Sequence, residues 1–222
     1  MIPLWKRLTD VSVSLLALVV LGPVMLLVAL AVKLSSPGPV FYIPKRTGHK
    51  GRLFGQIKFR TMRVGADRQG AFTCKNDPRI FPFGKFLRLF RLDELPQFFN
   101  VLRGEMSVVG PRPEDPAIVG ECYTAGQRRV LDTPPGMTCL RQVLLFPECA
   151  QLDAGGTDSQ QYYRQTILPK LLEMDLEYVR RRSFRLDLGL IAATAYLVAV
   201  KSWYVLLIKK TAPLRSRMGM AN

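Results

Sequence analysis

Apolar residues gather near both ends of this 222-residue chain. The first run, Val11 to Leu34, carries no charge before Lys33. It exceeds the roughly 20 residues that a helix needs to cross a bilayer. Pro23 follows Gly22 at its midpoint, where a proline removes a backbone hydrogen bond and kinks a helix. Each half is then roughly 18 Å long and reaches only about the bilayer midplane. The pattern predicts a membrane helix over residues 1–35, kinked at Pro23.

Basic residues flank this apolar run on both sides. Lys6 and Arg7 precede it, Lys33 lies at its end, and Lys45 and Arg46 follow it. Because the positive-inside rule places such residues on the cytoplasmic side, a re-entrant helix with both ends on that side satisfies the rule. A kinked helix that crosses the bilayer once is the alternative.

The second apolar run, Leu188 to Ile208, is interrupted by Lys201. A lysine near the middle of a spanning helix costs about 2.5–3.5 kcal/mol on insertion. We therefore expect one or two amphipathic helices in the membrane interface within a C-terminal region, residues 186–222. A helix packed in the protein core is the alternative.

Between these runs, residues 36–185 are more polar and are interrupted by Pro and Gly. The segment "SQQYYRQTILPKLLEMDLEYVRRR" has apolar residues at three- and four-residue steps, which predicts a helix that Pro169 kinks or restarts. "GQIKFRTM" fits a short strand or the entry to a helix. The predicted fold class is mainly α with short strands (α+β): a re-entrant N-terminal membrane helix, a compact cytosolic domain and interfacial amphipathic helices.

The charge balance narrows the choice of partners. The chain has 32 Lys and Arg against 17 Asp and Glu, a net charge of +15. Such a charge calls for nucleic acid, an anionic bilayer or phosphorylated substrates. Four cysteines without a CxxC pair and a single histidine, His49, argue against a zinc site or a disulfide framework. Acid–base or nucleophilic chemistry then falls to carboxylates.

Two adjacent carboxylates, Asp93 and Glu94, stand in "RLFRLDELPQFFNVLRG". The apolar residues of this segment predict a helix that ends at Gly104. Pro96 is tolerated only in a first turn, which sets the start of the helix at about Asp93. The structural interpretation makes Asp93 the N-cap and Glu94 a first-turn acid.

Cations around the acid pair favour a functional interpretation. They come from "IKFRTM", from "RLFR" and from "GPRP", and comprise Lys58, Arg60, Arg88, Arg91 and Arg112. Guanidinium groups neutralise and orient phosphate oxygens, which lets a carboxylate approach phosphorus. Adjacent helical residues point about 100° apart and share a proton poorly, so one acid is expected as nucleophile and the other as Mg²⁺ ligand. The alternative for the cations is a solvated basic face on anionic lipid.

The segment "KFLRLFRLDELPQFFNVLRGEMSVVGPRPE" closely resembles the signature of the bacterial sugar transferases, the monotopic polyprenyl-phosphate phosphoglycosyl transferases. "SPGPVFY", "IKFRTM" and "NDPRIFPFGKFLR" match upstream in order, and "YVRRRSFRLDLGLI" matches downstream. The resemblance spans nearly the whole chain without an additional N-terminal multi-helix region. The chain therefore looks like a small, minimal member.

The resemblance implies an enzyme of the EC 2.7.8 type. It moves sugar-1-phosphate from a UDP-sugar to undecaprenyl or another polyprenyl phosphate and releases UMP, the first membrane step of polysaccharide or glycoprotein glycan biosynthesis. It also implies a phosphosugar–aspartyl intermediate on Asp93 and Mg²⁺ coordination by Glu94. The sugar itself is not inferred.

The resemblance also indicates substrate-binding positions. Lys58, Arg88 and Arg112 match positions expected near the phosphates, and Arg60 joins them as a candidate from the same cation cluster. The downstream pattern "PGxTGxxQVxGR" appears here as "PGMTCLRQVLLF", which keeps Gln142 as a weaker substrate-binding candidate.

The chain also departs from the family pattern, for example at Pro44, where the family often has Gln. Cys139 replaces a glycine of the downstream pattern, whose final Gly-Arg is missing. Gly22 precedes Pro23 where the family usually has Ser-Pro, and Arg91 stands where the family often has Ser or Thr.

The resemblance implies a bacterial inner membrane location, with residues 36–185 as the catalytic domain on the cytoplasmic face and phospholipids as neighbours. A homodimer is left open. A membrane-tethered nucleic-acid binder is an alternative that the charge permits, but the sequence has no RNP-like, helix-turn-helix or zinc motif. A non-catalytic scaffold is another, which the intact acid pair disfavours.

Overall fold

The computed structural model describes residues 2–66, 77–144 and 161–217, and the side chains of these up to Val200. The predicted fold class is confirmed at its coarser level, since the described chain is mostly helical with short strands. Residues 145–160 and the cysteines Cys74 and Cys149 lie outside the described residues.

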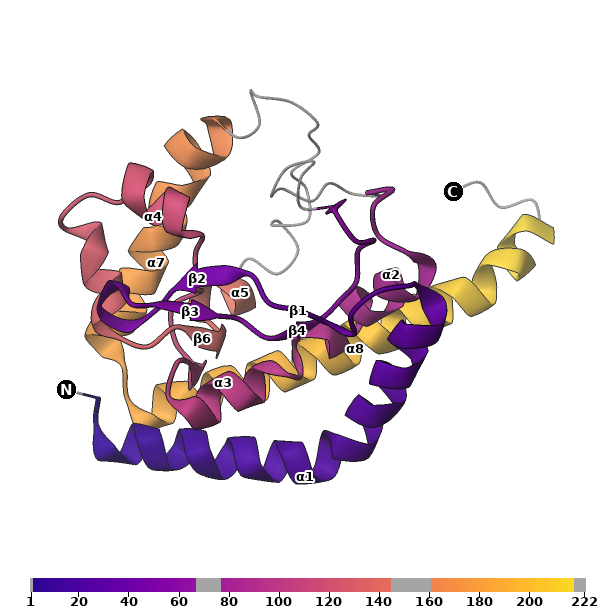
Figure 1. Cartoon of the computed structure of the whole chain (residues 1–222), viewed down its shortest axis with the longest axis horizontal. Helices are drawn as coiled ribbons and strands as arrows, with labels where there is room; N and C mark the ends of the chain where they lie inside the picture. Colours follow the sequence, from indigo (N-terminus) through magenta and orange to yellow (C-terminus); the bar gives the residue numbers. More distant parts are fainter. Residues whose placement is uncertain (1, 67–76, 145–160, 218–222) are drawn as a thin grey trace.

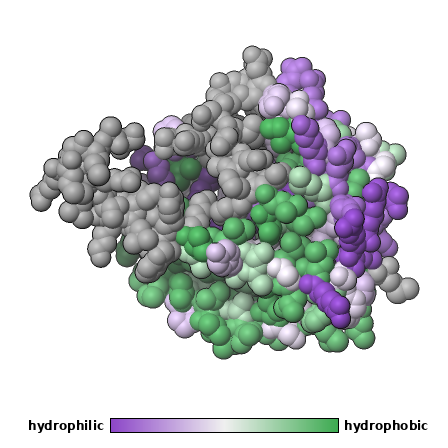
Figure 2. Space-filling view, turned by 180° about the vertical axis from the view of Figure 1, so that it is seen from behind, coloured by the Kyte–Doolittle hydropathy of each residue, from purple (hydrophilic) through white to green (hydrophobic). Residues whose placement is uncertain are grey.

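The first apolar run forms one helix, α1 (Leu4–Ser35), which continues through Pro23. Figure 1 shows that α1 bends partway along its length. Within the described residues it is the one helix long and apolar enough to cross a membrane. Its exposed apolar side chains include Leu15, Leu16, Val19, Val20, Leu26, Leu27 and Leu30. Figure 2 shows an apolar surface over the lower side of the molecule, along which α1 runs in Figure 1.

Polar contacts fix the start of α1 to the rest of the fold. The Lys6 ammonium is only 1% exposed and donates to the Val109 carbonyl at 2.8 Å and to Asp187 at 2.6 Å. Arg7 donates to the carbonyls of Val101 and Leu102 at 2.6 and 2.7 Å. The charge of Lys6 is thus taken up by a buried partner within the protein, and its place among the basic flanks on the cytoplasmic side stays a prediction.

The strands form three two-stranded sheets. β1 (Phe41–Tyr42) pairs antiparallel with β4 (Lys58–Phe59), and β2 (Lys45–Thr47) pairs antiparallel with β3 (Leu53–Gly55). β5 (Ser107–Val109) runs parallel to β6 (Gly136–Thr138). The strand alternative for "GQIKFRTM" is thus confirmed at β4.

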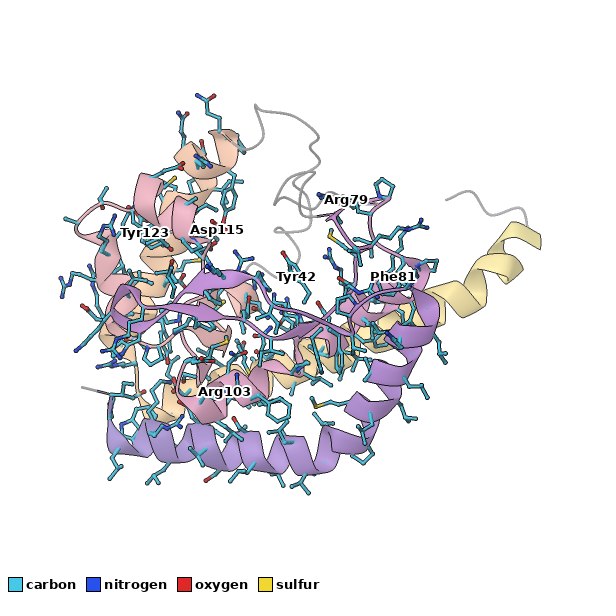
Figure 3. The ribbon with its side chains drawn as sticks, in the orientation of Figure 1. Tyr42, Arg79, Phe81, Arg103, Asp115 and Tyr123 are labelled. Atoms are coloured by element: carbon cyan, nitrogen blue, oxygen red, sulfur yellow. The ribbon has the colours of Figure 1, made fainter. Side chains whose placement is uncertain are left out.

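Helices and turns of the domain surround these strands (Figure 1). They are the 3₁₀ turn η1 (His49–Gly51), α2 (Pro82–Leu89), the 3₁₀ turn η3 (Leu92–Glu94), α3 (Gln97–Arg103), α4 (Pro116–Cys122), the 3₁₀ helix η4 (Gln127–Asp132) and α5 (Leu140–Leu144). Figure 3 places Arg79 and Phe81 beside α2, and Asp115 and Tyr123 near α4 at the other end of the strands.

The helix predicted around Pro169 is present, and its restart is confirmed. A π-helical turn, η5 (Tyr163–Ile167), leads into α7 (Leu168–Arg181), which has the proline in its first turn. A first turn tolerates proline because its backbone N–H groups have no partner within the helix.

The second apolar run belongs to one continuous helix, α8 (Phe184–Arg217). Its beginning is part of the core, where Asp187 and Leu190 are buried. Its exposed apolar side chains among those described include Leu188, Tyr196 and Val200. The alternative prediction, a helix packed in the core, is therefore confirmed for the start of α8. The placement of the rest of α8 in the membrane interface stays a prediction.

Three apolar clusters hold the fold together. One joins Val101, Met106 and Val109 to Tyr178 of α7 and Leu190 of α8. A second lies between the C-terminal half of α1 and α2 and comprises Met25, Val28, Val32, Phe59, Phe81 and Leu87. A third joins α4 and η4 to α7. The second cluster matters most for the site, because Leu92 and Leu95 on either side of the acid pair pack against it.

Candidate active site

Asp93 and Glu94 lie on the short turn η3, between α2 and α3. The prediction that a helix begins at Asp93 was wrong, because α3 begins at Gln97 after Pro96. Arg91 precedes the turn with φ 54°, a left-handed conformation that costs a non-glycine residue roughly 1–2 kcal/mol. The predicted end of the helix is confirmed, since Gly104 follows α3 with φ 79°.

Lys58 and Arg91 bracket the Glu94 carboxylate. Lys58 Nζ lies 3.9 Å from Oε1, and Arg91 Nη1 lies 3.4 Å from Oε2. All three side chains are partly buried, with 18%, 28% and 19% of Lys58, Arg91 and Glu94 exposed. The carboxylate is therefore shared between two cations rather than bound tightly to one.

Arg88 acts electrostatically on the other acid, Asp93. Its Nε donates to Thr61 Oγ1 at 2.8 Å, which orients the guanidinium. The positive charges of Lys58 and Arg88 both act on Asp93 and favour its ionised form. Lys58 comes from β4, which lies against η3, so the strand and the turn together place two cations at the acid pair.

The two acids titrate differently although they are neighbours. Burial, followed by the charge of Glu94, raises the pKa of Asp93 to about 6. Burial alone would raise the pKa of Glu94 too, but Lys58, Arg91 and Arg112 outweigh it and hold that pKa below its ordinary value. Carboxyl groups whose pKa values are pushed apart are suited to different tasks in one site.

Of the other predicted phosphate ligands, Arg112 acts on Glu94 and Arg60 has contacts elsewhere. Arg112 has an exposed side chain, and its charge is among those that lower the Glu94 pKa. Arg60 is 4% exposed and donates to the Pro39 carbonyl at 2.6 Å and to the Ser36 carbonyl at 2.7 Å. These contacts fix the chain after α1, and phosphate binding by Arg60 stays an untested prediction.

Gln142 reaches the site through another side chain. With its amide oriented so that the oxygen faces Arg91, that oxygen accepts hydrogen bonds from both terminal nitrogens of the guanidinium, one of them at 3.1 Å. Gln142 comes from α5 and thus links this helix to Arg91 and, through it, to Glu94. The sequence analysis counted Arg91 among the cations around the acid pair but not among the residues that match the family's phosphate-binding positions, since the family often has Ser or Thr there.

Arg141, Glu114 and Asp175 form a further group of charges close to Arg112. Arg141 donates to Glu114 at 2.6 Å and lies 3.4 Å from Asp175, and the side chains of Arg141 and Asp175 are 3% and 1% exposed. Burial raises the pKa of Asp175 to about 7 against the pull of Arg141. No sequence signal indicated this group, since its members come from separate segments without a common motif.

The acid pair has the ligand chemistry that Mg²⁺ prefers. Among the described residues, no cluster of three His, Cys, Asp or Glu side chains could hold a metal ion. Mg²⁺ is, however, usually held by one or two carboxylates together with substrate phosphates. Glu94 supplies one such carboxylate beside Asp93, so this residue fits the ion when a phosphorylated substrate and water supply the remaining ligands.

Comparison with known proteins gives the family context. The family described as Bacterial sugar transferase matches residues 2–201. The chain is 40% identical over 199 residues to a UDP-glucose:undecaprenyl-phosphate glucose-1-phosphate transferase of Xanthomonas campestris pv. campestris, covering 86% of this chain and 38% of that protein. A protein of the same name from Caulobacter vibrioides is 36% identical over 197 residues, covering 87% of this chain and 69% of that protein.

A further relative has another sugar in its name. It is a UDP-N-acetylgalactosamine-undecaprenyl-phosphate N-acetylgalactosaminephosphotransferase of Aeromonas hydrophila, 44% identical over 117 residues, which cover 52% of this chain and 28% of that protein. The chain thus spans well under half the length of the Xanthomonas and Aeromonas relatives. With a family match over most of its length, the chain belongs to the bacterial sugar transferase family.

Proposed function

We propose that this protein transfers sugar-1-phosphate from a UDP-sugar to undecaprenyl phosphate and releases UMP. The observation that carries the proposal is the acid pair itself: Asp93 and Glu94 lie among Lys58, Arg88 and Arg112, with pKa values displaced in opposite directions. The names of the relatives support the class of donor and acceptor.

Asp93 is the proposed nucleophile. A carboxylate oxygen of Asp93 forms a bond to the phosphorus that carries the sugar, and the bond from that phosphorus to the UMP oxygen breaks. UMP leaves with the electron pair. A phosphate oxygen of undecaprenyl phosphate then attacks the same phosphorus, and the Asp93 carboxylate leaves. The products are the undecaprenyl diphosphate sugar and an unmodified Asp93.

The surrounding cations reduce the repulsion between this carboxylate and the donor phosphates. Lys58 and Arg88 favour the ionised form of Asp93, while burial and Glu94 oppose it. A pKa of about 6 leaves the carboxylate ionised at neutral pH and more basic than an ordinary aspartate, which makes it the better nucleophile.

Glu94 would hold Mg²⁺ against the donor phosphates, while the Asp93 carboxylate attacks phosphorus. The ion would neutralise charge on the phosphoryl oxygens and polarise them. Because its two oxygens lie near Lys58 and Arg91, Glu94 stays ionised and retains its affinity for a cation. Glu94→Gln is expected to raise the Mg²⁺ concentration needed for half-maximal activity, and an unchanged metal response would remove this role.

We also propose that α1 is re-entrant and that the catalytic domain lies on the cytoplasmic face of the bacterial inner membrane. Contacts at both ends of the helix support this placement. Lys6 at the start donates to the Val109 carbonyl of the domain, and Ser36 just after the end accepts from Arg60. A helix that crossed the bilayer would carry one of these ends to the opposite side.

The test of the reaction is UMP release by the detergent-solubilised protein, given undecaprenyl phosphate and each member of a panel of UDP-sugars. At least one sugar should support release, and Asp93→Asn should abolish it while thermal unfolding stays near that of the unmodified protein. With donor alone, intact-mass spectrometry should detect the added mass of a sugar phosphate on the unmodified protein and none on the Asp93→Asn protein. Product formation by the Asp93→Asn protein would overturn the assignment of the nucleophile.

A further inference from the structure

Arg91 is a cation of the acid-pair site whose one task in the proposed reaction is so far to keep Glu94 ionised. Its guanidinium lies between two groups, the Glu94 carboxylate at 3.4 Å and the Gln142 amide oxygen. Its backbone takes a left-handed conformation that glycine or asparagine would adopt more easily. An arginine held in such a conformation beside the acid pair is retained at a conformational cost, which points to a task for its side chain.

The charge balance of the site indicates what that task is. Four cations, Lys58, Arg88, Arg91 and Arg112, act on the two carboxylates. These four side chains exceed the two carboxylates by two positive charges, which suits a diphosphate with one negative charge on each phosphate. Loss of Arg91 would halve this side-chain surplus, and a Mg²⁺ ion held by Glu94 would add the same charge with or without Arg91.

The contact with Glu94 is loose enough to be exchanged. At 3.4 Å it is longer than the 2.7–2.9 Å that is typical of a strong charge-assisted hydrogen bond, and the Arg91 side chain is 28% exposed. A phosphate oxygen is a good partner for a guanidinium fork, so a bound diphosphate would compete well for Arg91. Release of Arg91 would also leave one Glu94 oxygen more accessible to a metal ion.

We propose that Arg91 is a further substrate-binding residue, which binds the diphosphate of the nucleotide-sugar donor, and that Gln142 is the residue that positions it. This inference rests on the proposed function, since it assumes a nucleoside diphosphate donor. Gln142 acts through Arg91, because its amide oxygen accepts from both terminal nitrogens of the guanidinium and fixes its plane. The sequence departure at position 91 then becomes a feature of donor binding in this chain.

The experiment measures binding of UDP, used as the probe, to the full-length protein in detergent and Mg²⁺ by isothermal titration calorimetry. Arg91→Gly should raise the Kd for UDP about ten- to a hundredfold, since a charge-assisted contact is lost. Thermal unfolding should stay within about 3 °C of the unmodified protein, because glycine relieves the left-handed strain while the ion pair is lost. Arg91→Lys should bind with intermediate affinity, because an ammonium keeps the charge without the fork.

Gln142→Ala tests the positioning role. It should raise the Kd by about three- to tenfold in the presence of Arg91 and have no effect in an Arg91→Gly background, as expected for two residues acting as one unit. Equal effects in both backgrounds would overturn this role. Arg129→Gly, an exposed arginine on η4, is the matched control for loss of one positive charge and should leave the Kd within twofold.

The results separate this inference from the proposed function. Binding of UDP by Arg91→Gly with the affinity of the Arg129→Gly control would overturn the inference and leave the proposed function intact. Failure of the unmodified protein to bind UDP would overturn the proposed donor class, and the inference with it.

Discussion

Replacement of Lys6 by methionine should destabilise the protein strongly, because it leaves a buried carboxylate without its cation. The Lys6 side chain is 1% exposed and that of Asp187 is 4% exposed, and their charged atoms lie 2.6 Å apart. Tyr178 also donates to Asp187 at 2.8 Å, but this single neutral donor does not replace the lost charge. Removal of one partner from a buried ion pair costs about 3–5 kcal/mol.

The magnitude can be converted into a melting temperature. In a protein of this size, 1 kcal/mol shifts Tm by about 2–4 °C, so Lys6→Met should lower Tm by about 6–20 °C. The assay is thermal unfolding in detergent at a fixed scan rate, followed by helical circular dichroism. Lys6→Met combined with Asp187→Leu should recover much of the loss, because an apolar pair leaves no buried charge unpaired.

An exposed ion pair of the same chain provides the control. Arg181 lies 2.5 Å from Glu177 on α7, but its side chain is 77% exposed. Arg181→Ala should cost only about 0.3–0.5 kcal/mol, or a Tm change of roughly 1–2 °C. If Lys6→Met lowered Tm no more than this control, the reasoning that burial makes the loss of the Lys6–Asp187 pair costly to stability would be refuted.

Three further predictions concern the reaction, a buried arginine and topology. Because burial and Glu94 raise the pKa of Asp93 from 3.8 to about 6, kcat/KM should rise as pH increases through about 6 and then level off; a profile flat from about pH 5 to 8 would contradict ionised Asp93 as the attacking group. Arg60→Met should lower stability by about 2–4 kcal/mol, because it leaves the Pro39 carbonyl and other buried acceptors without their donor; an unchanged Tm with a raised KM for donor would favour phosphate binding by Arg60 instead. Cysteines introduced at Leu4 and Pro37, on either side of the apolar part of α1, should react with a membrane-impermeant reagent only from the cytoplasmic side, and labelling from opposite sides would establish a spanning helix.

The features that the sequence predicted correctly depend on a few neighbouring residues. The apolar run around Pro23 is one long helix, Gly104 ends α3 in the left-handed conformation, and Pro169 stands in the first turn of α7. Apolar periodicity and the backbone limits of glycine and proline act over one or two turns. The start of α3 was misjudged because the strained conformation of Arg91 allows a separate short turn to hold Asp93 and Glu94.

The sequence by itself determined that many cations accompany the adjacent acids Asp93 and Glu94, but only the tertiary structure decided the task of each cation. Lys6 neutralises a buried aspartate, Arg60 binds carbonyls after α1, and Arg91 lies between Glu94 and Gln142. Along the chain these residues look alike, since each is a basic residue near an apolar segment. The physical reason is that a positive charge is satisfied by any nearby acceptor, and packing between distant segments decides which acceptor is near.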